Sequence, residues 1–450
     1  MTTSDTAAAK KISSRLHALT SQRMIFLAIA FLVGLAVGTA AFFLKSLIRW
    51  ISLPLLPHLH YDGPNYLFIL YPVVGIMLTV IYQRYVLHQE IYHGVERLRK
   101  SLAERNYNMS PRLILAPIIA SSLTLGFGGS AGSEGPIASS GAAIGSNIGR
   151  WFNLTETQVM VMIACGAGAG IAGIFKAPVG GALFTIEILA LPLDALALIA
   201  LFISTLTSAL TAYVWSGCTP DVTFTSIPAL NWTHVIPVIL LGLFTGIYSA
   251  YYAIVMKKMT AHYNRMKNHW VKNISSGLTV GILLFLFPTL YGEGYGAVAK
   301  LLADVPHTII DYTWLTNIFK DYASGQILLM SVALAMLLAK PFATSSTNGG
   351  GGVAGDFAPT IMIGSVAGFL YAAGSNYFFG THLPVVDFVF LGTTGVMAGA
   401  IGAPCMAIMI TVEMATAYPL LLPATAVATL SYLTKRLLTT NYHDYLSGWN

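Results

Sequence analysis

The sequence predicts an all-α polytopic membrane protein made of two repeats whose helices are broken inside the membrane. Of its 450 residues, 55% are hydrophobic and only 9% are charged, and the mean hydropathy of +0.69 exceeds what a soluble core requires. Several apolar runs reach spanning length, and glycine and proline interrupt others at matched positions. Such breaks survive in lipid only where protein or a water-filled cavity covers the freed backbone groups.

The first apolar run extends from Met24 to Leu44, and a later one extends from Trp232 to Met256. At about 20 residues per helix, the apolar segments predict roughly ten to fourteen helices, several of them short or broken. The first run is too long for a cleaved signal peptide and lacks a clear cleavage site. Basic residues precede it, so we expect a cytoplasmic N-terminus. These residues are Lys10, Lys11, Arg15 and Arg23.

The remaining composition narrows the function. The net charge of +6 gathers in connecting loops such as 97–100 and 257–272, which is typical of cytoplasmic loops, and we expect no nucleic-acid partner. The three cysteines are far apart and no spaced histidine pairs occur, so we expect neither a metal site nor a cofactor. We divide the chain into a cytoplasmic segment (1–23), a first membrane repeat (24–216), a connecting loop (217–231), a second membrane repeat (232–433) and a C-terminal tail (434–450).

An internal repeat supports this division. The pattern GxxxPxxxxGxxxG occurs twice in register, once from Gly132 through Pro136 and once from Gly355 through Pro359. A second block matches without a gap and ends at Glu187 in the first half and at Glu413 in the second. Small residues recur in any membrane bundle, but matches in fixed order over two blocks favour a duplication. Matched interruptions of this kind point to a transporter's binding site.

The glycine-rich turns favour anion binding. In each repeat a turn is followed by a proline, Pro136 or Pro359, in the first turn of a short apolar helix, where a missing N–H costs nothing. Free backbone N–H groups and the positive end of the helix dipole then face the cavity. We expect the two helix starts, with Gly132, Gly135 and Gly355 around them, to converge on one anion near the midplane.

Glu134 is the one carboxylate in the first turn. Such a carboxylate occupies the position of the anion when ionised and vacates it when protonated, so proton uptake and anion occupancy are linked. The alternative is a simple helix cap. For Glu187 and Glu413, near the ends of apolar stretches, caps or structural hydrogen bonds are the favoured interpretation.

These residues together resemble a known family. GSEGP followed by GAAIGSNIG, GDFAP in the second half, and the blocks IFKAPVGGALFTIE and IGAPCMAIMITVE are similar to the CLC chloride channel and chloride/proton antiporter family, of the prokaryotic type without C-terminal CBS domains. The resemblance covers roughly Met24 to Tyr445. It implies an all-helical homodimer in which each subunit holds its own pore between two repeats of inverted topology.

The resemblance also assigns roles. Glu134 matches the external gating glutamate, and Gly355, Phe357 and Pro359 match the GxFxP segment, whose N–H groups at Phe357 and Ala358 would face the anion. The tyrosine that lines the pore in this family matches Tyr445, with Tyr442 as the alternative.

Four positions depart from the family pattern. His93 stands where the GSGIP motif supplies a serine hydroxyl, so it either donates a ring N–H to the anion, more strongly when protonated, or is an ordinary loop residue. Ser133 replaces a basic residue, and Asp356 replaces an apolar one and should weaken anion attraction unless it turns away to cap its helix. Ile188 replaces the intracellular proton-transfer glutamate of many antiporters.

The leading hypothesis is therefore a chloride/proton antiporter gated by Glu134. Its partners would be chloride, protons, the lipid bilayer and a second copy of the chain, in a bacterial inner membrane. One alternative is a passive channel of the same fold, favoured by Ile188, and another is a transporter for fluoride or nitrate. A membrane hydrolase with Ser130 as nucleophile would need a histidine base, and none is evident, so we expect no enzymatic activity.

Overall fold

The chain is almost entirely helical. The computed structural model describes residues 3–59, 63–91, 98–99, 102, 104, 107–190, 194–219, 230–303, 306 and 325–447, with side chains described from residue 22 to residue 440. Within these ranges the one β-bridge joins Gly132 to Gly355, and no strand forms. The predicted all-α fold class is confirmed.

The helices of the first half run from the N-terminus to residue 215. They are α1 (Thr3–Ser52), α2 (Leu67–Ile81), α4 (Arg112–Gly126), α5 (Glu134–Trp151), α6 (Glu156–Phe175), α7 (Pro178–Phe184), which continues as the π-helical turn η3 (Thr185–Leu189), and α8 (Ala195–Trp215). The helices of the second half are α9 (Val235–Asn264), α10 (His269–Leu286), α11 (Tyr295–Leu302), α13 (Gly325–Gly349), α14 (Phe357–Phe379), α15 (Val385–Ile401), α16 (Pro404–Ala415) and α17 (Leu421–Ser447).

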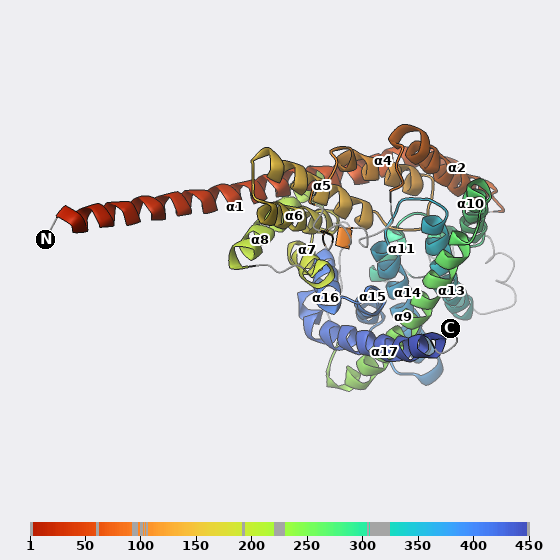
Figure 1. Cartoon of the computed structure of the whole chain (residues 1–450). Coiled ribbons are helices and arrows are strands. Elements are labelled where there is room, and N and C mark those ends of the chain that lie inside the picture. The colour runs from red at the N-terminus through yellow and green to blue at the C-terminus, as the bar shows by residue number, and fades with distance from the viewer. Residues whose placement is uncertain are drawn as a thin grey trace.

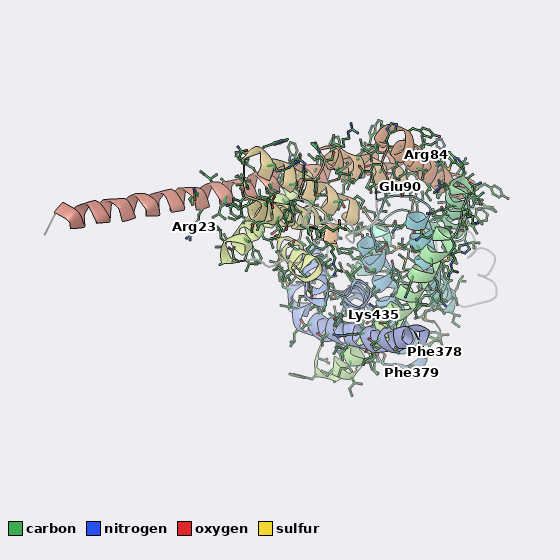
Figure 2. All side chains as sticks on the ribbon, viewed as in Figure 1. Arg23, Arg84, Glu90, Phe378, Phe379 and Lys435 are labelled. Carbon is green, nitrogen blue, oxygen red and sulfur yellow. The ribbon has the colours of Figure 1, made fainter. Side chains whose placement is uncertain are left out.

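The protein is an integral membrane protein. Seven helical stretches of the described residues are long and apolar enough to cross a membrane, and four apolar helices of 10–17 residues accompany them. Large apolar side chains also cover the outside of the helical body, among them Phe378 and Phe379 at the end of α14 (Figure 2). Water would penalise such a surface, whereas the hydrocarbon of a bilayer does not.

The two halves repeat the same packing. In the first half α5 packs on α6, and α1 packs on both α6 and α8. In the second half α14 packs on α15, and α9 packs on both α15 and α17. Helices at equivalent positions also meet across the boundary, because α7 packs on α16 and α2 packs on α10. Reciprocal contacts between equivalent elements are typical of two units related by a two-fold axis.

Glycines allow this close packing at equivalent places. A Cβ added to Gly141 of α5 would collide with the carbonyl oxygen of Gly166 in α6, and the reverse is also true. In the second half a Cβ added to Gly364 of α14 would lie 2.7 Å from the carbonyl oxygen of Gly392 in α15. The repeated glycines therefore serve backbone-to-backbone packing, as small residues do in membrane helices.

Two helices cross the domain boundaries that the sequence predicts. Helix α1 runs without a break from Thr3 to Ser52, so the predicted cytoplasmic segment 1–23 belongs to the same helix as the first span. Its N-terminal part extends away from the helical body (Figure 1). Helix α17 likewise continues through residue 433 to Ser447. Part of the predicted connecting loop, residues 220–229, lies outside the described residues. The division into repeats stays a prediction.

Candidate anion site between the two repeats

The two GxxxP turns meet each other directly. Gly132 donates its N–H to the carbonyl oxygen of Gly355 at 2.8 Å, and Gly355 donates its N–H to the carbonyl oxygen of Gly132 at 2.6 Å. These glycines occupy matched positions of the repeat, so the pair joins equivalent positions of the two halves. It brings the N-termini of α5 and α14 together inside the protein, as the sequence predicts.

The carboxylate of Glu134 lies between these helix starts. Its Oε1 atom accepts hydrogen bonds from the backbone N–H of Phe357 and from that of Ala358, the latter at 3.2 Å. The side chain is only 1% exposed, and its Oε2 atom has no hydrogen-bond partner among the residues that the structure describes. The carboxylate thus occupies the N-terminus of α14, the position that an anion would take.

Glycine is required on both sides of this carboxylate. A Cβ added to Gly355 would lie 2.6 Å from Oε1 of Glu134 and 2.8 Å from the backbone nitrogen of Gly135. A Cβ added to Gly132 would overlap both carboxylate oxygens. The absent side chains therefore create the space in which an anion or the Glu134 carboxylate can approach the backbone.

Other predicted residues complete the helix starts. Pro136 lies in the first turn of α5, and Pro359 lies in the first turn of α14. The ring of Phe357 packs edge-on against that of Phe184 at 5.9 Å between centroids, so its side chain serves packing while its N–H faces Glu134.

Asp356 precedes α14 without capping it by a side-chain hydrogen bond. Its Oδ1 atom instead accepts a hydrogen bond from Nδ2 of Asn348 at 2.9 Å. Asp356 therefore does not turn away to cap its helix, which was the condition under which its charge would not weaken anion binding. A carboxylate one residue before Phe357 makes the local electrostatic potential more negative, and this disfavours a bound anion.

A second carboxylate, that of Glu293, binds the residue that precedes α5. The sequence patterns did not indicate this acid. Oε1 of Glu293 accepts the backbone N–H of Ser133 at 3.0 Å and the Ser133 hydroxyl at 2.5 Å. The position at which the family resemblance implies a basic residue thus carries a serine bound to an acid. Glu293 stands between two glycines, Gly292 and Gly294, and this was the available signal.

A buried lysine, also missed, lies beside the same loop. Lys340 is fully buried in α13, and its Nζ donates to Oγ of Ser130 at 2.9 Å. Ser130 in turn donates its hydroxyl to the carbonyl oxygen of Leu290 at 2.5 Å. Lys340 is the one charged residue of the apolar helix α13, and a lone charge in such a segment is the signal that would have found it. The Ser130 hydroxyl is itself buried, and its partners among the described residues are Lys340 and Leu290.

Glu187 and Glu413 are caps, as the sequence favours, and each caps a helix of the other half. The carboxylate of Glu187 accepts the N–H groups of Cys405 and Met406, at 3.1 and 2.7 Å, in the first turn of α16. The carboxylate of Glu413 accepts the N–H groups of Val179 and Gly180, at 3.1 and 2.8 Å, in the first turn of α7. Ile188, next to Glu187, contributes a half-buried apolar side chain to the main hydrophobic cluster.

Three predicted site residues cannot be placed. His93 lies outside the described residues, and so do the side chains of Tyr442 and Tyr445, although the backbone of both tyrosines is part of α17. Their assignment to the anion pathway stays a prediction.

Comparisons with known proteins agree with this architecture. The family model described as "Voltage gated chloride channel" matches residues 74–436. A voltage-gated ClC-type chloride channel ClcB from Citrobacter koseri is 28% identical over 315 residues, which cover 68% of this chain and 69% of that protein.

Two solved structures share the fold. The crystal structure of a slow cyanobacterial Cl⁻/H⁺ antiporter superposes with a TM-score of 0.73 at 22% identity, covering 92% of this chain and 94% of that chain. A CLC-type fluoride/proton antiporter superposes with a TM-score of 0.70 at 22% identity, covering 92% of this chain and 96% of that chain. The predicted membrane fold with broken helices is confirmed.

Proposed function

This chain belongs to the voltage-gated chloride channel family, and on that premise we propose that it transports chloride across the membrane in exchange for protons. The observation that carries the proposal is the Glu134 carboxylate on the N–H groups of Phe357 and Ala358. A carboxylate that fills an anion's position can be replaced by chloride, and its departure is favoured when it takes up a proton.

The contacts suggest how one exchange step proceeds. With Glu134 ionised, its carboxylate satisfies the N–H groups at the start of α14 and chloride is excluded. Protonation removes its negative charge, the side chain leaves, and chloride accepts the same N–H groups. Because these donors are backbone dipoles rather than full charges, the ion is held without being trapped. Release of the proton brings the carboxylate back and expels chloride.

Roles for the remaining site residues follow from the same proposal. Gly355, Phe357 and Ala358 would bind the anion through the backbone, Gly132 and Gly135 would keep its surroundings open, and Tyr445 and His93 would line its path. These roles rest on the match to the family motifs. We further propose that the protein works as a homodimer in a bacterial inner membrane with the N-terminus in the cytoplasm, since basic residues precede the first span.

A passive chloride channel is the second candidate. Ile188 places an apolar side chain where many antiporters of the family carry a proton-transfer glutamate, and Glu187 beside it is engaged in capping α16. Transport of fluoride or nitrate is a further alternative. No enzymatic reaction is part of the proposal.

One experiment separates the candidates. Purified protein in liposomes is given a chloride gradient, and the internal pH is followed with a dye. Uphill proton movement driven by chloride identifies an antiporter, whereas chloride flux without proton movement identifies a channel. Replacing chloride by fluoride or by nitrate in the same assay ranks the anions.

A further inference from the structure

The backbone around Glu293 presents its side chain to Ser133. Gly292 and Gly294 on either side of it have φ values of 64° and 83°, in the left-handed region that glycine adopts at no steric cost. Between them, the Glu293 carboxylate reaches both the N–H and the hydroxyl of Ser133. Glu293 is half-buried, whereas Glu134 is almost fully buried, so Glu293 extends from the site toward the surface.

Glu293 and Glu134 hold the two facing helix starts in the same manner. Glu134 accepts N–H groups at the start of α14, and Glu293 accepts the N–H of Ser133, the residue before α5. Ser133 is directly followed by Glu134 in the chain. Its hydroxyl donates to Glu293 and makes no capping bond within its own helix. Ser133 therefore stands between the two acids: its hydroxyl is bonded to Glu293, and its neighbour in the chain is Glu134.

A buried cation lies beside this pair of acids. The Lys340 ammonium interacts electrostatically with both Glu134 and Glu293, and its bond to Ser130 ties it to the segment that carries Glu293. Unpaired charges are costly in such a buried region. The Lys340 ammonium therefore lies where it can compensate the charge of either acid.

Further titratable groups face the same region. Asp356 at the start of α14 interacts with Glu134, and Tyr252 on α9 interacts with both Asp356 and Glu134. Lys45 on α1 lies over the ring of Tyr295, 5.6 Å from its centroid, two residues after Glu293. Unlike these groups, Glu293 is hydrogen-bonded to Ser133, the residue that directly precedes Glu134.

We propose that Glu293 is the group that exchanges the proton of Glu134 with water, through the Ser133 hydroxyl. The Ser133 hydroxyl turns from Glu293 toward Glu134 and passes its proton to the Glu134 carboxylate, while its oxygen accepts the proton of the protonated Glu293 carboxyl. Glu134 then leaves neutral, chloride accepts the N–H groups of Phe357 and Ala358, and Glu293 takes a new proton from water. The site has gained one chloride and one proton, so its net charge is unchanged.

The test rests on the proposed antiport and uses the full chain in liposomes. Glu293→Gln keeps an acceptor for Ser133 but cannot carry the proton, so chloride-driven proton uptake should fall by about 100-fold, the scale of a lost acid–base group. Chloride flux should fall with it, because an ionised Glu134 keeps chloride from the N–H groups of Phe357 and Ala358. In the Glu134→Gln background, where no carboxylate competes, Glu293→Gln should leave chloride flux within about threefold, because no chloride ligand is removed. Ser133→Ala keeps the backbone bond and should lower proton uptake in the same way. Glu156→Gln, an exposed acid in the first turn of α6, is the matched control.

The outcomes are distinct. Wild-type proton uptake in Glu293→Gln would overturn the role of Glu293 and leave the antiport standing. Equal loss of proton uptake in Glu134→Gln and in the double variant with Glu293→Gln would support action through Glu134. If the wild type moves no protons, the antiport fails, and Glu293 is then judged by the pH profile of chloride efflux. A profile shifted by Glu293→Gln would support its proton exchange with Glu134, and an unchanged profile would overturn it.

Discussion

Glu187 and Glu413 each cap the helix that leads to the other. Glu187 binds the first turn of α16, the helix that contains Glu413, and Glu413 binds the first turn of α7, which continues into η3 and Glu187. Two carboxylates that exchange helices in this way tie the repeats together at their matched positions. Because α7 also packs on α16, we regard this closed arrangement as a structural lock between the halves.

The lock predicts a loss of stability on neutralisation. Glu187→Gln and Glu413→Gln each leave one carbonyl oxygen that can accept a neutral hydrogen bond, and the amide nitrogen cannot accept the second N–H that the carboxylate accepts. Each change should lower the free energy of unfolding by about 1–2 kcal/mol. Thermal unfolding in detergent measures the effect, with Glu156→Gln as the exposed control. A control that loses as much stability as either variant would contradict the prediction.

Glu134→Gln should separate chloride transport from protons. The amide resembles the protonated carboxyl and cannot titrate, so chloride flux should persist within a few-fold and become independent of pH between about pH 5 and pH 8. Coupled proton movement should be abolished. Liposome flux assays for both ions check this, and a variant that still drives protons uphill would refute the gating role of Glu134.

The backbone, rather than the side chain, should bind the anion at the start of α14. Gly355→Val inserts atoms between the N–H groups and their ligand, and chloride affinity should fall by about tenfold or more, equivalent to one lost charge-assisted hydrogen bond. Phe357→Leu leaves every N–H in place and removes only the edge contact with Phe184, so it should change affinity by less than about threefold. Equal effects of the two changes, measured by calorimetry, would place the anion elsewhere.

Asp356→Asn should strengthen chloride binding. The substitution removes a negative charge beside the anion position and keeps an oxygen that can accept the bond from Asn348. At the effective dielectric of protein interiors, a gain of about 1 kcal/mol is expected, or roughly fivefold in affinity. The comparison is made by calorimetry in the Glu134→Gln background, where no carboxylate competes. Unchanged affinity there would mean that Asp356 carries no charge in the wild type.

Sequence patterns predict the fold class, the repeat and the placement of Glu134, because these depend on local features. A glycine turn, a proline in the first turn and a carboxylate define a helix start without knowledge of distant segments. The bond from Phe357 to Glu134 spans 223 residues, and here the match between the repeats indicated which segments would meet. Where two segments have no matching pattern, the sequence does not predict that they lie in contact.

The missed residues show where that limit lies. Glu293 and Lys340 have no partner in the repeat pattern, and their contacts with Ser133 and Ser130 span 160 and 210 residues. The caps at Glu187 and Glu413 were predicted as caps, but a cap normally serves its own helix, and a sequence does not indicate that two helices exchange theirs. Periodicity also could not predict that α17 continues beyond residue 433, because its final turns are polar.

The backbone pairing of Gly132 with Gly355 is symmetric, but the residues two positions later are not: Glu134 in one half corresponds to Phe357 in the other. Two identical halves would have presented either two glutamates, which repel each other, or two phenylalanines, which cannot carry a proton. The proposed gate therefore depends on the two halves being different at this position. The match between the halves accounts for the paired helix starts, and the difference between Glu134 and Phe357 supplies the asymmetry that the proposed gate requires.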